Sequence, residues 1–164
     1  MTSTPSNNAN PYATGTADDV RDLLVKAISD DSVGEAASFF RSRAVALVTA
    51  VSPVLVWLRD HKGIQLDGKR CYAALGLREI ATLWDRKVAL VREPATGRVQ
   101  EVHAEDLPAE LHRLLGAYLT DLPGYDPAHP SEKQRSDKVE AQHCFALFHL
   151  TVSLSGSTPA SRAA

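Results

Sequence analysis

The stretch of this sequence that comes closest to a catalytic motif is Gly63–Arg70, with the letters GIQLDGKR. Its G-x-x-x-x-G-K spacing is that of a phosphate-binding loop, whose backbone N–H groups surround phosphates and whose eighth residue, Ser or Thr, holds magnesium. Here Arg70 takes the eighth position, and the bulky Ile64 and Leu66 lie where the backbone would have to wrap phosphate. We therefore predict a turn between two helices, with no nucleotide and no other cofactor.

The histidines and cysteines are spaced in ways that predict neither a metal centre nor a nucleophile. No two of the six histidines lie four residues apart, as they would in the H-E-x-x-H helix of a zinc protease. Cys71 and Cys144 belong to no C-x-x-C pair, so both are expected to be buried free thiols. His143 and Cys144 are neighbours on an expected helix and point apart, which excludes a local dyad. With no G-x-S-x-G motif either, we expect a chain that is not an enzyme.

Positive charge is concentrated in the middle third of the sequence. Residues 41–98 carry eleven basic and five acidic side chains (+6), whereas residues 1–40 (two and six) and 99–164 (five and nine) each sum to −4. Such a segment is typical either of a solvated helix face or of a surface for nucleic acid or an acidic partner. The candidate binding residues in it are Arg41, Arg43, Lys69, Arg70, Arg78, Arg86 and Lys87.

The elements that must position these residues belong to one domain. A chain of 164 residues with 44% hydrophobic and 23% charged residues is typical of a single soluble domain, and we expect it to be cytoplasmic. Its most apolar stretch, Ala44–Leu58, contains no charged residue. This stretch is shorter than the roughly twenty residues that span a bilayer. We predict that it forms the centre of a buried helix over Ser32–His61, kinked near Pro53.

Around this long kinked central helix, the hydrophobic periodicity predicts a mainly α fold, a helical bundle with one small β-hairpin. Further helices are expected over residues 17–29, 67–75, 77–85, 106–121 and 131–154, and the hairpin strands over residues 87–92 and 98–103. Gly76 is expected to end one of these helices in a left-handed conformation. Residues 1–14 are predicted to be a disordered lead-in, 15–155 an all-alpha domain and 156–164 a disordered tail.

Four segments carry a family resemblance: Asn10–Tyr12, Pro53–Gly63, Tyr118–Asp126 and Ala141–Phe148. Together they resemble the all-alpha domain of type IV coupling proteins, the TraG/TraD-type ATPases of conjugation and type IV secretion. The similarity extends over residues 10–155, and the letters WLRD and LPGYD, in that order, are its most specific part. The resemblance implies a cytoplasmic module, inserted in a nucleotide-binding domain, that helps to select and dock a relaxase–DNA complex or a secreted effector.

The resemblance also implies partners: relaxase or effector substrates, accessory proteins of the secretion system, possibly DNA, and the parent ATPase domain if this chain is a piece of a longer one. It implies no direct membrane span. The phosphate-binding and acidic magnesium motifs of the family do not occur here, so ATP hydrolysis is not carried over. The Leu122–Asp126 loop, with Tyr125, joins the basic residues as a candidate binding surface. The alternative is a stand-alone helical DNA-binding module that uses the basic residues.

Overall fold

The computed structural model describes residues 10–27, 35–122, 125 and 143 of the chain. Within them the fold is mainly helical with a two-stranded antiparallel hairpin, which confirms the predicted fold class. The elements are α1 (Pro11–Thr14), α2 (Ala17–Lys26), α3 (Glu35–Lys62), α4 (Gly68–Ala74), α5 (Leu77–Arg86), β1 (Val88–Arg92), β2 (Val99–His103) and α6 (Ala109–Thr120). Apart from His143, the helix expected over residues 131–154 lies outside the described residues, and the domain boundaries stay predictions.

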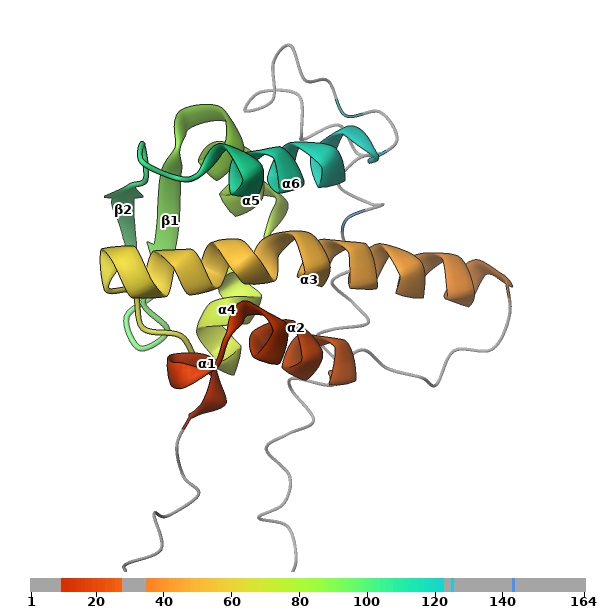
Figure 1. The fold of residues 1–164 in the computed structure, drawn as a ribbon, viewed down its shortest axis with the longest axis horizontal. Coiled ribbons are helices and arrows are strands. Elements are labelled where there is room, and N and C mark those ends of the chain that lie inside the picture. Colours follow the sequence, from red (N-terminus) through yellow and green to blue (C-terminus); the bar gives the residue numbers. More distant parts are fainter. Residues whose placement is uncertain (1–9, 28–34, 123–124, 126–142, 144–164) are drawn as a thin grey trace, which may run out of the picture.

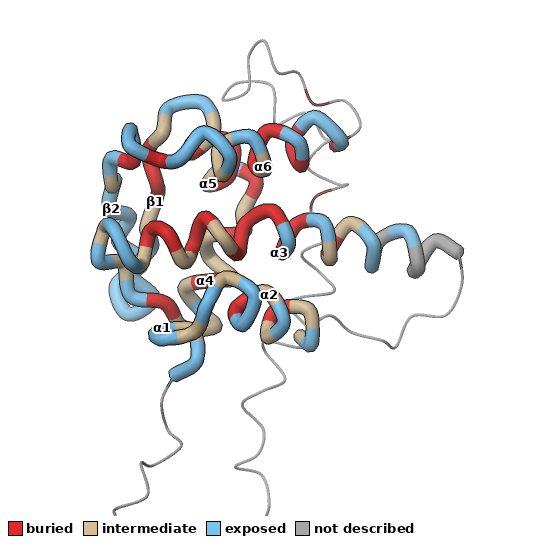
Figure 2. Tube along the Cα trace, in the orientation of Figure 1, coloured by how far each residue is buried: buried red, intermediate tan, exposed pale blue. Residues whose placement is uncertain are grey.

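Helix α3 lies at the centre of the molecule, with α1, α2 and α4 along one side, α5 and α6 along the other, and the hairpin beside its C-terminal end (Figure 1). Its middle turns are the most deeply buried part of the helix (Figure 2). Leu47, Val48 and Val54 are fully buried there. Burying an aliphatic side chain of this size stabilises a fold by about 1.5–3 kcal/mol, so the apolar stretch predicted to form the core does form it.

Pro53 lies inside α3, which continues without a break from Glu35 to Lys62. The buried hydroxyl of Ser52 donates a hydrogen bond to the carbonyl of Val48, one turn earlier. The kink expected near Pro53 stays a prediction. By length and composition the Arg41–Lys62 part of α3 could cross a membrane, but half of its apolar window is buried inside the fold. The core helix of a globular domain has the same properties.

The predicted hairpin is confirmed. Its strands pair with Val88 opposite His103 and Arg92 opposite Val99, and β1 packs against α4 and α5. The connecting loop contains Gly97 at φ 70°, a left-handed conformation that glycine adopts without steric cost. Because the hairpin rests on two helices through β1, it does not depend on its own two strands for stability.

A left-handed residue also occurs where the chain passes from α5 to β1, and there it is Lys87, at φ 51° and ψ 41°. Such a conformation costs a residue with a side chain about 1 kcal/mol. The expectation that Gly76 would be left-handed is wrong, because Gly76 has φ −61° and ψ 147° and is the N-cap of α5. An added Cβ there would meet a carboxylate oxygen of Glu79, so the Glu79 side chain would have to move.

The C-terminal end of the expected lead-in is ordered. The side-chain oxygen of Asn10 accepts the backbone N–H of Tyr12 at 3.0 Å and so caps α1. Thr16 and Asp19 then form a capping box that begins α2, which buries Val20 and Leu24 completely. Residues 1–9 lie outside the described part of the chain. Residues 11–14 of the expected lead-in are therefore helical.

Candidate binding surface

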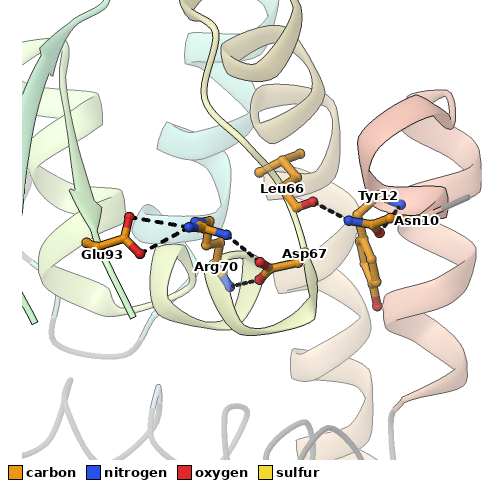
Figure 3. A network of polar contacts seen from close by, with 6 residues as sticks. All are labelled: Asn10, Tyr12, Leu66, Asp67, Arg70 and Glu93. Atoms are coloured by element: carbon orange, nitrogen blue, oxygen red, sulfur yellow. Dashed lines mark hydrogen bonds and ion pairs between the residues drawn. The ribbon is translucent and has the colours of Figure 1, made fainter. Parts of the chain in front are cut away.

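The first two family-like segments meet at the C-terminal end of α3. The Nη1 of Arg59 donates a hydrogen bond of 2.8 Å to the carbonyl of Tyr12, and its Nε donates one of 2.8 Å to the carboxylate of Asp60. The amide of Asn10 donates a hydrogen bond of 2.8 Å to the carbonyl of Leu66 (Figure 3). The hydrogen bond from Arg59 lowers the pKa of Asp60. These contacts fasten α1 to α3 and to the link that follows it.

Arg70 extends these contacts to the hairpin. Asp67 is the N-cap of α4: one carboxylate oxygen accepts the backbone N–H of Arg70 at 2.8 Å, and the other accepts its guanidinium. The Nη2 of Arg70 lies 3.1 Å from the carboxylate of Glu93, just after β1 (Figure 3). We call the connected set the N-terminal network; its members are Asn10, Tyr12, Arg59, Leu66, Asp67, Arg70 and Glu93.

The backbone of Gly63–Arg70 does not have the geometry of a phosphate-binding loop. Gly63 follows α3 at φ 68°, a short extended link leads to Asp67, and α4 begins at Gly68. Phosphates bind to free N–H groups at a helix N-terminus, but the Asp67 carboxylate takes up that position here. The stretch is a turn between two helices, as predicted.

A groove of about 420 Å³ lies between α1, the end of α3 and the link to α4. Asn10 and Gln65 are exposed in its wall. An arginine has five N–H donors, and the Nη2 of Arg59 makes no hydrogen bond to the residues that the structure describes. The groove therefore offers amide and guanidinium groups to the carbonyl or carboxylate oxygens of a bound polypeptide. Its lining residues are Asn10, Ala13, Arg59, Gly63, Ile64, Gln65, Leu66, Asp67 and Arg70.

The other two family-like segments meet at Tyr118 and His143. The Tyr118 hydroxyl lies 2.8 Å from Nδ1 of His143, and Nε2 of His143 lies 2.8 Å from the carbonyl of Leu75. Because a carbonyl only accepts, Nε2 carries the proton and Nδ1 accepts from the tyrosine hydroxyl. We call these three residues the His143 cluster. His143 is 2% exposed, and burial lowers its pKa to about 4, so the ring is neutral at pH 7.

Both tryptophans pack inside the domain. Trp57 is 9% exposed and stacks on His61, with ring centroids 4.9 Å apart. Trp84 stacks on His112 at 5.8 Å and lies so close to Gly116 that an added Cβ would be 2.5 Å from the indole nitrogen. These contacts favour the core interpretation over exposed anchors for a partner.

Cys71 is fully buried, and burial raises the pKa of its thiol to about 12. A thiol held in that form is a poor nucleophile and a poor metal ligand. Cys71 is thus the buried free thiol that the sequence predicted, whereas Cys144 lies outside the described residues. Across residues 10–27, 35–122, 125 and 143, no group of three or more His, Cys, Asp and Glu side chains is arranged to hold a metal ion.

Arg43, Arg70 and Tyr125 are candidate binding residues whose contacts within the fold can be described. Arg43 donates a hydrogen bond of 2.8 Å to the carbonyl of Asp121 at the C-terminal end of α6, and its guanidinium lies 5.2 Å from the centre of the Phe39 ring. Arg70 belongs to the N-terminal network. Tyr125 is 9% exposed and lies in the hydrophobic core.

The other five candidates come from three places in the fold. Arg41 is near the start of α3, Lys69 is in α4, Arg78 and Arg86 are in the first and last turns of α5, and Lys87 follows α5. All of them are exposed except Lys87, which is half-buried. Only Lys69 lies next to the groove in the chain. The binding role of all eight residues stays a prediction.

The chain is similar to the type 4 coupling protein DotL of Legionella pneumophila, with 29% identity over 150 residues. This similarity supports a coupling-protein relationship. It covers 92% of the chain, which spans only 18% of the length of DotL. No protein-family model matches the sequence, and no solved structure matches it significantly.

Residues that carry the coupling-protein resemblance join parts of the fold that are far apart in the chain. Arg59 joins the first two segments through Tyr12, and His143 joins the last two through Tyr118. Sequence reasoning did not select Asn10, Arg59 or Gln65 as site residues, although all three line the groove. Asn10 and Arg59 belong to family-like segments, and this membership could have identified them as candidate site residues. Gln65 offered no such signal.

Proposed function

We propose that this chain is a non-catalytic recognition domain of a type IV coupling protein, which docks relaxase–DNA or effector substrates, or the adaptors that carry them. The observation that carries the proposal is the similarity to DotL, which extends over nearly the whole chain yet covers a small part of that coupling protein. In this role the domain works in the cytoplasm, at the inner-membrane secretion complex, beside an ATPase domain supplied by the parent protein.

The groove beside α1 is the docking surface that we propose for the substrate or adaptor. It combines the exposed amides of Asn10 and Gln65 with the Nη2 of Arg59, which has no hydrogen bond to a described residue. Such groups bind polar polypeptide segments, because each buried donor must find an acceptor. The walls of the groove are held in place by the N-terminal network, so little ordering would be needed on binding.

Binding by the folded chain to relaxase, effector and accessory proteins of the same secretion system tests this proposal. Gln65→Ala and Lys69→Glu alter the groove and its rim, and Arg113→Glu is the matched control because Arg113 is an exposed cation on α6. We expect the groove variants to weaken binding by roughly threefold to tenfold, and the control to leave it unchanged. Absence of binding to all these proteins, or equal losses in Lys69→Glu and Arg113→Glu, would contradict the proposal.

DNA binding, the alternative function, depends on the basic residues acting together. Two of them, Arg43 and Arg70, already bind a carbonyl and two carboxylates, and no feature of the described surface favours this alternative specifically. Affinity for DNA that falls steeply with salt, and that is lost when Lys69, Arg70, Arg86 and Lys87 are replaced by Ala, would nevertheless establish it. Binding measurements with secretion-system proteins and with DNA therefore separate the two functions.

A further inference from the structure

The outer strand of the hairpin has backbone groups that point away from the fold. The N–H of Ala104 donates to the carbonyl of Lys87, and the N–H of Glu93 donates to that of Arg98, both at 2.8 Å. Hydrogen-bonded pairs alternate along an antiparallel ladder. Gln100 and Val102 of β2 therefore bond to β1.

The remaining residues of β2 are Val99, Glu101 and His103, and by the same alternation they direct their N–H and C=O groups to the open edge. Their backbone groups make no hydrogen bond to any residue in the part of the chain that the structure describes. All three residues are exposed, and the side chain of Val99 is among the most exposed large apolar groups, at 45%. β2 lies at the left edge of the molecule, on the side of β1 away from α5 (Figure 1).

Within the described residues, this edge lacks several of the features that usually keep an exposed strand from pairing. Natural edge strands are commonly blocked by lysine, proline, a bulge or a covering loop. β2 contains neither lysine nor proline, and its pairing with β1 runs in continuous register from Val99 to His103 with no bulge. An unblocked edge of this kind can accept an additional strand from another polypeptide.

The charge along the edge of β2 favours an incoming strand of positive charge. Glu101 lies at its centre, and Glu105 follows shortly after the strand; both are exposed. Asp106 comes next, and it is paired with Lys62 at 2.7 Å. From Val99 to Asp106 the chain has no lysine or arginine. Because opposite charges on directly paired strands attract and like charges repel, an incoming strand is favoured when lysine or arginine lies opposite Glu101.

We propose that the free edge of β2 binds an extended, basic segment of a partner protein as a third strand of the hairpin. The backbone of Val99, Glu101 and His103 supplies the hydrogen bonds, and Glu101 supplies the preference for positive charge. This surface is separate from the groove beside α1. The edge can therefore bind its partner whether or not the groove has the function proposed above.

Amide hydrogen exchange of the labelled full chain tests the proposal directly. The probe is a short acetylated peptide in which valine alternates with lysine, and its control has glutamate in place of lysine. We expect the basic peptide at millimolar concentration to slow exchange at Val99, Glu101 and His103, while Gln100 and Val102, already bonded to β1, stay unchanged. No protection with the basic peptide, or equal protection with both peptides, would overturn the proposal.

Two variants locate the interaction at the strand. Glu101→Lys should weaken binding of the basic peptide by about two- to fivefold and strengthen binding of the acidic one. Glu110→Lys, at an exposed residue of α6, is the matched control. Val99→Pro removes an outward N–H without removing a bond to β1, so it should abolish binding while Gln100 and Val102 keep their protection. Equal weakening by Glu101→Lys and Glu110→Lys would count against the proposal. Protection that appears without peptide and disappears on dilution would identify a second copy as the occupant and overturn it too.

Discussion

Two sets of contacts hold the family-like segments together, and they differ in their physical character. The His143 cluster is buried and uncharged, with each ring nitrogen of His143 paired to a single partner. The N-terminal network is partly exposed and charged: the side chain of Arg70 is 22% exposed and that of Glu93 is 48% exposed. Both connect residues that are far apart in the chain.

This difference teaches which set stabilises the fold and which can be used for binding. A buried polar group that loses its partner carries the full cost of desolvation, whereas exposed ion pairs contribute about 0–1 kcal/mol. The His143 cluster should therefore be essential for folding and inaccessible to a partner. The N-terminal network contributes less to stability than the His143 cluster and lies beside the groove. Its residues can therefore take part in binding at a smaller cost to the fold.

The largest effect is expected from His143→Ala. This change leaves the Tyr118 hydroxyl and the Leu75 carbonyl without partners in the core and creates a cavity, which should cost about 3–5 kcal/mol of unfolding free energy. Urea denaturation measures it. His61→Ala, which removes an exposed histidine, is the control and should cost less than about 1 kcal/mol. Equal losses of unfolding free energy in the two variants would contradict the essential role of the His143 cluster in folding.

A pH dependence should come from the same cluster. The pKa of His143 is about 4 in the folded protein, against an ordinary value of 6.5. Between these values the unfolded chain binds a proton that the folded chain does not, so stability falls as the pH is lowered from 6.5 to 4. The loss amounts to roughly 3 kcal/mol. Urea midpoints at several pH values should show a shallower dependence in His143→Gln than in the unchanged protein, and identical slopes would contradict a neutral buried histidine.

An intermediate effect is expected from Arg59→Ala. The carbonyl of Tyr12 loses its donor and the aliphatic stem of a largely buried arginine is removed, which should cost about 1–2 kcal/mol. The loosened α1 should also exchange the amide of Gly15 faster, because that N–H bonds to the carbonyl of Pro11. Arg78→Ala, at an exposed arginine, should change neither quantity. Unchanged exchange in Arg59→Ala would mean that α1 is held by other contacts.

The smallest effect is expected from Arg70→Met, which removes the pairs with Asp67 and Glu93. The cost should be below about 1 kcal/mol and should shrink in about 1 M salt, where charges are screened within about 3 Å. The loss in His143→Ala should be the same at both salt concentrations. If the Arg70 variant were insensitive to salt, the network would stabilise the fold by packing, and the contrast between the two sets would disappear.

Much of the fold was predictable because its signals are local. The spacing of apolar residues predicted α5, Asp67 predicted the start of α4, and the turn residues around Gly97 predicted the hairpin, all of which depend on neighbours within a few positions. The candidate site was less predictable. Arg43, Arg70 and Tyr125 were selected by charge or by motif, but each makes its contacts inside the fold, since residue type does not tell whether a side chain already has a partner.

The sequence by itself determined helices α2 to α6, the hairpin and the apolar centre of α3, because periodicity and turn chemistry are properties of short stretches of chain. Only the tertiary structure decided which distant groups meet: Arg59 with Tyr12, 47 positions apart, and His143 with Leu75, 68 positions apart. It also decided that Lys87, and not Gly76, adopts the left-handed turn, because the packing of the hairpin on α5 offsets a cost that local preference would avoid.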